Sequence, residues 1–476
     1  MRAFGLSRRP ALMLLVGLGL SGCVPGAERP ELHLEVPASY RTAGKGDADA
    51  AVPALAWWRG FRSAELTALM ESAQLYNLDI AVAIAQIAQA DANVGISGAA
   101  LLPSLSGSAN AERQGAGAAS GTTGAGGTFS QFSAGLTASY ILDFWGKNRA
   151  TLAASEESAT AARYNREVVA LSTMATVANT YFQVLAAQDQ IKVARRNLGA
   201  AERILALIKQ QFSGGTASQL DVSQQEALVA TQRAAIPPLE VTVAQNTAAL
   251  ALLVARAPAN FTVRGGSTTQ IAVPRVTPGL PSELLYQRPD IRQAEAQLTS
   301  ANFSVDAARA AFFPQIQLTA TNGTQSAALA SLFGPGAWYY TLSAGLTQPL
   351  FDGFQLESQL KLAKGQQLQF LQAYRKSVLS AFADVEKALV ALQKYTLQER
   401  LQSDVVASSR KAFEVAETQL RGGTVNLITV LQAQQTLFTA ENNLVTVRLN
   451  KLLAASSLFQ ALGGGWTPAG TLAALQ

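Results

Sequence analysis

Two long stretches of the chain, residues 148–212 and 357–421, carry apolar residues at seven-residue spacing and contain no proline. The repeating positions are Val177, Val184, Ile191, Leu198, Leu205 and Phe212 in the first, and Leu371, Val378, Val385 and Leu392 in the second. Such a repeat keeps one seam of an α-helix against a partner helix. A helix of about 65 residues is about 100 Å long, which predicts coiled coil.

Each long helix is expected to end at a pair of glycines, Gly214-Gly215 or Gly422-Gly423. Glycine accepts the left-handed conformation that commonly follows a helix C-terminus. Apolar periodicity resumes at once, which predicts return helices at about 218–256 and 426–462. The chain is therefore expected to form two antiparallel helical hairpins, with Pro237-Pro238 bending or breaking the first return helix.

Shorter stretches resemble β-strands. Gln315-Ile316-Gln317-Leu318-Thr319-Ala320 alternates polar and apolar residues with a period of two, as a strand with two unlike faces does. Strands are predicted at about 104–111, 129–142, 315–322 and 339–351. Aromatic clusters at strand ends, Trp338-Tyr339-Tyr340 and Phe144-Trp145, suit the two interfaces of a membrane.

The same landmarks occur twice along the chain. Asp79 and Pro103 recur as Asp290 and Pro314, both at an offset of 211 (290 − 79 and 314 − 103). The run 133–137 recurs at 343–347, and the glycine pairs are 208 residues apart (422 − 214). The chain is therefore predicted to be a tandem duplication, with repeats at 56–265 and 266–463 and a tail at 464–476.

Two strands per repeat give four per chain, too few for a membrane barrel. An unpaired strand edge in lipid leaves backbone groups unsatisfied, and single-chain bacterial barrels start at about eight strands. If the strands cross a membrane, several copies must complete the barrel. The expected fold class is mainly α with membrane β-strands.

The amino terminus has the pattern of an exported lipoprotein. Arg2, Arg8 and Arg9 precede an apolar run, 11–20, which has the length of a signal-peptide core. Residues 1–22 are predicted to be the signal peptide and Cys23 the acylated first residue, followed by a linker at 23–55. Several acyl chains on one residue anchor a protein firmly.

Composition argues against most enzymes. Cys23 is the single cysteine and His33, placed in the linker, the single histidine, so Cys/His zinc sites and histidine-based nucleophile sets are absent. No cofactor other than the lipid and no metal is expected. Without the three leader arginines, 34 basic residues (37 − 3) face 32 acidic ones, which gives no indication of nucleic-acid binding.

The chain resembles the TolC-like outer membrane factors, and specifically the NodT-type lipoproteins of RND efflux systems. The motifs that carry the resemblance are Leu142–Lys147 (LDFWGK), Arg288–Glu295 (RPDIRQAE), Ala308–Pro314 (ARAAFFP) and Gly215–Val222 (GTASQLDV). The resemblance implies a homotrimer with a 12-stranded barrel in the outer membrane and a helical periplasmic body. It also implies docking to a periplasmic adaptor and an inner-membrane RND-type pump.

The family further implies a closed periplasmic gate near the second return helix, where relatives commonly carry acidic residues. The matching positions here, Thr429 and Gln432, are neutral, so weaker cation selectivity is expected. Asp221 is expected to complete a capping box with Ser218 or to supply a gate charge, and the two roles do not exclude each other. The glycine pairs are expected to be turns, and the resemblance makes them adaptor-docking tips.

Two other functions share part of the pattern. A channel for type I protein secretion has the same architecture, although the lipoprotein and NodT-like motifs favour small-molecule efflux. A lipid-anchored periplasmic coiled-coil scaffold explains the anchor and the seven-residue repeat, but leaves the duplicated strands unexplained.

Overall fold

The computed structural model describes residues 55–115, 128–274 and 281–466, together with residues 29, 31, 36–37 and 39–41. Cys23 and His33 lie outside the described residues. The chain divides into two compact units. One contains Ala88–Thr160 and Glu295–Ala373; the other contains the described parts of His33–Ile87, Ala161–Ala294 and Tyr374–Gln476.

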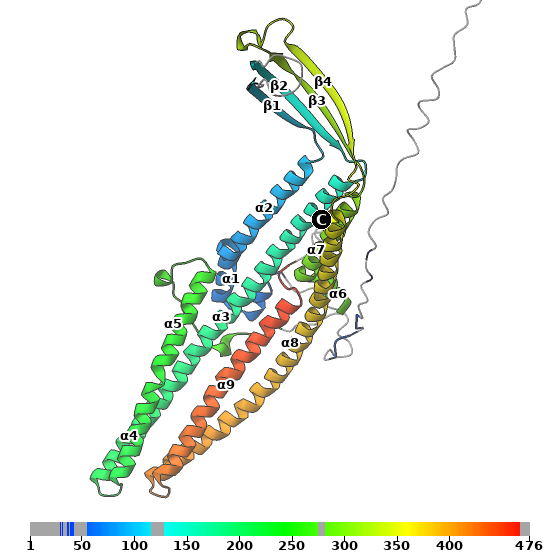
Figure 1. Ribbon diagram of the computed structural model, residues 1–476. Helices are drawn as coiled ribbons and strands as arrows, with labels where there is room; N and C mark the ends of the chain where they lie inside the picture. Colours follow the sequence, from blue (N-terminus) through cyan, green and yellow to red (C-terminus); the bar gives the residue numbers. More distant parts are fainter. Residues whose placement is uncertain are drawn as a thin grey trace, which may run out of the picture. The chain divides into compact units, whose positions relative to one another are not determined.

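The first unit holds a curved four-stranded antiparallel sheet (Figure 1). Its strands lie in chain order, so β1 and β4 each have a neighbour on one side within the described chain. The strands are β1 (Ser104–Gly115), β2 (Thr128–Leu142), β3 (Gln315–Ser326) and β4 (Trp338–Thr347). The fourth strand ends earlier than the predicted 351, because Pro349 has no N–H to continue the ladder.

The two faces of the sheet differ in chemistry. The register aligns Leu105, Ala138, Ala320 and Leu342 in one row across the four strands, and Ser106, Thr137, Thr321 and Thr341 in the next. Because successive side chains of a strand point to opposite sides, the first row belongs to an apolar face and the second to a polar face. The Thr137 and Thr321 hydroxyls are 3.3 Å apart on the polar face. No residue of the four strands is buried against other described parts of the chain on either face.

Aromatic clusters lie at both ends of the sheet. At the loop end, Trp338 and Tyr340 belong to the apolar face, with ring centroids 5.4 Å apart, while Tyr339 lies on the polar face. At the helix end, Trp145 stacks on Phe313 with centroids 4.7 Å apart, and its indole N–H donates to the Pro314 carbonyl at 2.8 Å. Trp145 thus joins the first repeat to the second within this unit.

The remaining regular structure is helical. The helices are α1 (Ala64–Tyr76), α2 (Leu78–Ala99), α3 (Lys147–Ser213), α4 (Gln219–Ala234), α5 (Ile236–Leu253), α6 (Pro281–Gln287), α7 (Pro289–Ala310), α8 (Gln355–Arg421) and α9 (Leu427–Ala461), with a 3₁₀ turn at Trp57–Phe61. The two long helices, α3 and α8, have 67 residues each. The first return helix breaks between α4 and α5, where Pro237 and Pro238 occupy the first turn of α5.

In the second unit the long and return helices pack as two hairpins, but the seven-residue track that the sequence predicts along α3 is not buried over its whole length. Val177 and Val184 are fully buried, whereas Phe212 at the far end of the same track is 44% exposed. Toward the tip, buried positions shift to Ile204 and Ile208. A straight helix of 3.6 residues per turn drifts away from a seven-residue repeat, which explains the shift.

Equivalent residues of the two repeats make equivalent contacts with the last helix of each repeat. The Asn77 side chain donates to the Leu253 carbonyl at 2.8 Å, and the Arg288 guanidinium donates to the Ala461 carbonyl at 3.0 Å. Asn77 and Arg288 both precede the short helix that leads to the sheet, and Leu253 and Ala461 both end the last helix of their repeat. In each repeat, therefore, a polar side chain satisfies an end carbonyl of the last helix.

Two helical stretches, Ala64–Ala99 and Lys147–Ser213, have windows apolar enough by composition to cross a membrane, although the sequence after residue 22 has no uninterrupted apolar run of about 20 residues and so predicts no membrane-spanning helix. Alanine raises the hydropathy of both windows. The first stretch is interrupted at Asn77, which caps α2 by accepting from the Asp79 and Ile80 amides at 2.9 and 3.1 Å. More than half of the window in α3 is buried against other helices, so its apolar surface is used in packing.

Candidate entrance gate at the hairpin tips

Both hairpins end in the same turn. In the first, the Thr216 amide donates to the Gln211 carbonyl at 2.9 Å and the Gly215 amide to the Phe212 carbonyl at 3.0 Å. In the second, the Thr424 and Gly423 amides donate to Gln419 and Leu420 at 2.9 and 3.1 Å. This pair of bonds is the Schellman motif.

The two glycines of each pair have different roles. Gly215 and Gly423 have φ of +76° and +70°, whereas Gly214 and Gly422 do not have positive φ. A Cβ on Gly214 would meet the Gln210 and Gln211 carbonyl oxygens at 3.6 Å, an ordinary contact. Only the second glycine of each pair, Gly215 or Gly423, is therefore required by the backbone conformation. The sequence predicted a turn role for both glycines of each pair, and the structure supports this requirement for the second one only.

The return helices begin with equivalent caps. Ser218 Oγ accepts from the Asp221 amide at 3.2 Å, and Asp221 Oδ2 accepts from the Ser218 amide at 2.8 Å, which completes the predicted capping box of α4. In α9, 208 residues later, Asn426 Oδ1 accepts from the Thr429 amide at 3.1 Å and the Thr429 hydroxyl at 2.9 Å. Thr429 is thus the counterpart of Asp221.

The carboxylate of Asp221 is both capped and accessible. Hydrogen bonds from the Ser218 hydroxyl and then the Ser218 amide lower the pKa of Asp221 below its ordinary value of 3.8. The negative charge also lies in the first turn of a helix, where the helix dipole favours it. The capping role of Asp221 is therefore observed, and its charge stays available to solvent.

A crevice of about 490 Å³ separates the two tips. Asp221 lines it together with Gly422, Gly423, Arg421 and Asn426. Thr429 and Gln432 are exposed on α9 and do not line the crevice. Of the predicted gate residues, the structure thus brings Asp221 to the turn of the second hairpin and leaves the two neutral positions on the surface.

Behind the tips, an apolar cluster holds the hairpins together. Ile204 and Ile208 of α3 pack there with Val430 of α9. The Gln434 amide of α9 donates to the Asn197 carbonyl of α3 at 3.3 Å in the buried interface. Moving one hairpin relative to the other would have to separate these contacts.

A buried acid that sequence reasoning missed also joins the hairpins. Glu441 of α9 has a side chain only 8% exposed, and its carboxylate pairs with Arg410 of α8 at 2.6 Å and Arg196 of α3 at 3.5 Å. The available signal was its spacing: Phe438 and Val445 are seven residues apart, and Glu441 lies three residues after the first of them, where a seven-residue repeat has its second apolar position. An acid on a seam needs cationic partners.

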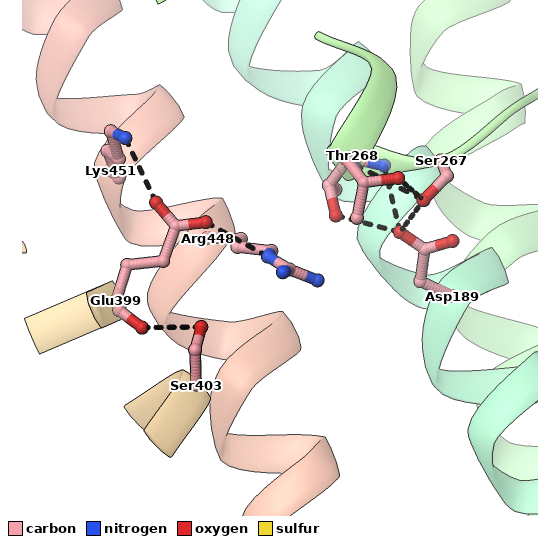
Figure 2. A network of polar contacts seen from close by, with 8 residues as sticks. Asp189, Ser267, Thr268, Glu399, Ser403, Arg448 and Lys451 are labelled. Carbon is pink, nitrogen blue, oxygen red and sulfur yellow. Dashed lines mark hydrogen bonds and ion pairs between the residues drawn. The ribbon is translucent and has the colours of Figure 1, made fainter. Parts of the chain in front are cut away.

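Farther from the tips, two polar networks hold the second unit together (Figure 2). Glu399 of α8 accepts from Arg448 at 3.0 Å and Lys451 at 2.9 Å, both on α9. Burial raises the pKa of Glu399, but the hydrogen bonds from Lys451 and Arg448 outweigh it and leave the pKa lowered. Asp189 of α3 accepts from the Thr268 amide at 2.8 Å and the Ser267 hydroxyl at 3.0 Å, which attaches the connection between the repeats.

Arg288 is a second residue whose role sequence reasoning understated. Pro289 begins a helix, α7, as proline commonly does at a first helical position. Arg288 itself is buried and makes a two-point contact with Asp290, at 3.0 and 2.7 Å, in addition to its bond to Ala461. Among the described residues, no group of three or more His, Cys, Asp or Glu side chains is placed to hold a metal ion.

This duplicated fold, with its four strands and two long hairpins, defines a class of outer-membrane channel proteins. The sequence matches the family described as outer membrane efflux protein twice, over residues 69–256 and 280–464, and the chain belongs to that family. The two matches correspond to the two repeats, so the predicted tandem duplication is confirmed.

Similar proteins agree with this assignment. The chain is 37% identical over 454 residues to the pyoverdine export outer membrane protein OpmQ of Pseudomonas aeruginosa, covering 94% of this chain and 95% of that protein. It is 31% identical over 460 residues to the solvent efflux pump outer membrane protein SrpC of Pseudomonas putida, covering 96% and 97%. The structure is similar to the open-state outer membrane channel MtrE of Neisseria gonorrhoeae, with a TM-score of 0.80 and 28% identity over 93% of this chain and 98% of that one. The expected family, fold class, outer-membrane location and function in efflux are confirmed.

Proposed function

We propose that three copies of this chain form the passive exit duct of a tripartite efflux pump for small molecules. The observation that carries the proposal is the four-stranded sheet, which has one apolar face, one polar face and two open edges. Lipid tolerates no open edge. Joining β4 of each copy to β1 of the next gives 12 strands (three times four), with the apolar face toward lipid and the polar face toward a water-filled lumen.

The hairpin tips are the proposed docking point for a periplasmic adaptor, which would connect the duct to an inner-membrane RND-type pump. Gly214, Gly215, Gly422 and Gly423 form the two exposed turns. The names of the relatives link them to pyoverdine and to solvents. For this chain we propose small molecules admitted by the partner pump and a role in conduction, not catalysis, since the family consists of channel components.

The mass of the purified, unheated complex in mild detergent tests this assembly. A trimer is expected. A monomer would mean that the strands do not build a membrane barrel and would favour the periplasmic scaffold. A conducting trimer that restores protein secretion but no small-molecule efflux to a cell lacking its own duct would assign the chain to type I secretion.

The lipid anchor at Cys23 is a separate proposal, supported by the signal-peptide pattern before it. The chain labelled with palmitate in growing cells should carry the label on Cys23, and Cys23→Ala should lose it. Because the barrel alone holds the trimer in the membrane, that variant should still yield trimers when exported behind a cleavable leader. Label retained in Cys23→Ala would refute the acylation site.

The gate proposal concerns Thr429, Gln432 and Asp221. A ring of carboxylates in a narrow entrance attracts cations, and the neutral Thr429 and Gln432 leave that attraction weaker here. Thr429→Asp and Gln432→Asp should therefore increase the block of conductance by multivalent cations. Unchanged block in both variants would remove these positions from the entrance. Asp221→Asn would then show whether the first hairpin supplies the charge.

A further inference from the structure

The membrane sheet contains two charged residues. The sequence from 104 to 142, with the first two strands and their loop, has Glu112 and Arg113 as its only charged side chains. The sequence from 315 to 347, with the other two strands and their loop, has none. Any fixed charge along the lumen of the barrel must therefore come from one of these two neighbours.

Adjacent residues of a strand point to opposite faces, so only one of the two faces the lumen. Glu112 lies at the same parity as Ser106 and Ser108, pairs with Gln131 across the ladder, and accepts from the Gln114 amide on its own face. Arg113 lies at the parity of Leu105 and Ala109. The register therefore places Glu112 on the polar face and Arg113 on the apolar face.

Both residues lie near the outer end of β1. The strand leaves the helices at Ser104, so Glu112 is eight residues farther out, about 26 Å along the strand at a rise of about 3.3 Å per residue, or about 20 Å along the membrane normal at a tilt of about 40°. The apolar band of an outer-membrane barrel is about 25 Å tall. Arg113 thus reaches the headgroup level, where a cation on the apolar face is tolerated, and Glu112 reaches the mouth of the lumen.

We propose that Glu112 sets the charge preference of the outer mouth of the duct. The inference rests on the proposed trimer, in which three Glu112 carboxylates form one ring in a lumen that the other strand residues leave uncharged. The remaining side chains on the polar face are hydroxyls, amides and a few uncharged apolar or aromatic groups. The preference is for cations over anions and requires no bound ion.

Salt dependence is the characteristic sign of such a ring. Twelve strands about 4.8 Å apart and tilted by about 40° close at a radius of about 12 Å, so the carboxylates lie about 10 Å from the axis. Three charges at that distance should raise the cation concentration on the axis roughly four-fold in 10 mM salt, where the Debye length is about 30 Å. At 1 M the Debye length is about 3 Å, and the enrichment should disappear.

Reversal potentials of purified trimers in planar bilayers under a KCl gradient test the proposal. Glu112→Gln should lower the potassium-over-chloride preference in dilute salt and leave it unchanged near 1 M, while Glu112→Asp should keep most of the preference. Arg113→Gln is the matched control, adjacent in sequence and opposite in face, and should change the selectivity much less, because its charge lies farther from the axis, outside the barrel wall.

The outcomes separate this inference from the proposed function. Trimers that conduct with the same selectivity in Glu112→Gln would overturn the role of Glu112 but leave the duct intact. A rise in cation preference in Arg113→Gln, equal to the fall in Glu112→Gln, would overturn the assignment of faces. A wild-type chain that forms no conducting trimer would overturn the proposed function and this inference with it.

Discussion

At the residue scale, the hairpin turns depend on the handedness of single positions. Gly215 and Gly423 have a backbone conformation that costs an L-residue roughly 1–2 kcal/mol, because Cβ approaches the following carbonyl. Nothing lies within 4 Å of a Cβ added at either position, so conformation and not crowding decides the cost.

Gly215→Ala is therefore expected to destabilise the first tip by about 1 kcal/mol. Gly214→Ala, one residue earlier and not left-handed, should be neutral or slightly stabilising. Hydrogen exchange of the Thr216 amide, which closes the turn, measures the difference. Equal exchange rates in the two variants would show that the turn does not depend on this handedness.

The cap of α4 should depend on pH. The folded state lowers the pKa of Asp221, so the charged cap contributes stability above the ordinary value of 3.8, and this contribution is lost as the pH falls through the lowered folded value. Protection of the first-turn amides of α4, corrected for intrinsic exchange, should fall in that acidic range. In Asp221→Asn the step should vanish, while the cap at Asn426, which has no carboxyl group, serves as an internal reference that should not respond.

At the element scale, ion pairs between helices differ in burial and therefore in their contribution. Glu399 is 24% exposed and contacts two cations that are also mostly buried, whereas Glu226 and Lys209 are about half exposed. Solvent screens the second kind of pair, which contributes about 0–1 kcal/mol.

Glu399→Gln should lower the free energy of unfolding by about 2 kcal/mol, because it leaves Arg448 and Lys451 without their anionic partner. Glu226→Gln is the matched control, with an expected change near zero. Thermal unfolding of the detergent-solubilised protein, followed by circular dichroism, should show a lower midpoint for the first variant only. Equal midpoints would mean that the network is as well solvated as the exposed pair.

Sequence periodicity predicted the elements better than their contacts. Helix α3 could be anticipated because no proline or glycine pair interrupts it, and β1 and β3 begin where Pro103 and Pro314 end a helix. The burial of individual residues along α3 could not be anticipated, because a straight helix of 3.6 residues per turn drifts away from a seven-residue repeat. Glu441 was missed for a different reason: its partners Arg410 and Arg196 lie on other helices, and sequence spacing does not show which charges meet. The bond from Arg288 to the Ala461 carbonyl was missed for the same reason.

At the scale of the whole molecule, the two faces of the sheet make opposite demands on neighbouring residues. Leu342 and Ser343 lie near the middle of β4, on the apolar and polar faces respectively. Leu342→Arg should cost about 2–4 kcal/mol in the bilayer and reduce the yield of trimers. Ser343→Arg should assemble normally, since its side chain would enter water.

The measurement is the amount of trimer that each of the two variants shows on a gel when the sample is loaded without heating. Loss in both would show that β4 tolerates no arginine on either face. Loss in Ser343→Arg alone would reverse the assignment of lumen and lipid.

The requirement for several copies to close a barrel could be argued from the sequence because it needs only the number of strands, and it stays a prediction. The crevice between the hairpin tips could not be predicted from the sequence, because it depends on which turn of one hairpin lies against the first turn of the return helix of the other. The duplication explains why the gate positions were hard to assign: Asp221 and Thr429 occupy equivalent caps, and only the structure shows that Asp221 lines the crevice.

The open edges of β1 and β4 also have a genetic consequence. If a barrel closes only when three sheets pair edge to edge, one chain that cannot pair its edge also inactivates the two intact chains in the same trimer. In a cell that makes intact and edge-defective copies together, the fraction of trimers that form a closed duct would equal the cube of the fraction of chains that are intact. Edge mutations in this gene should therefore be dominant, whereas mutations that merely prevent a chain from folding should be recessive.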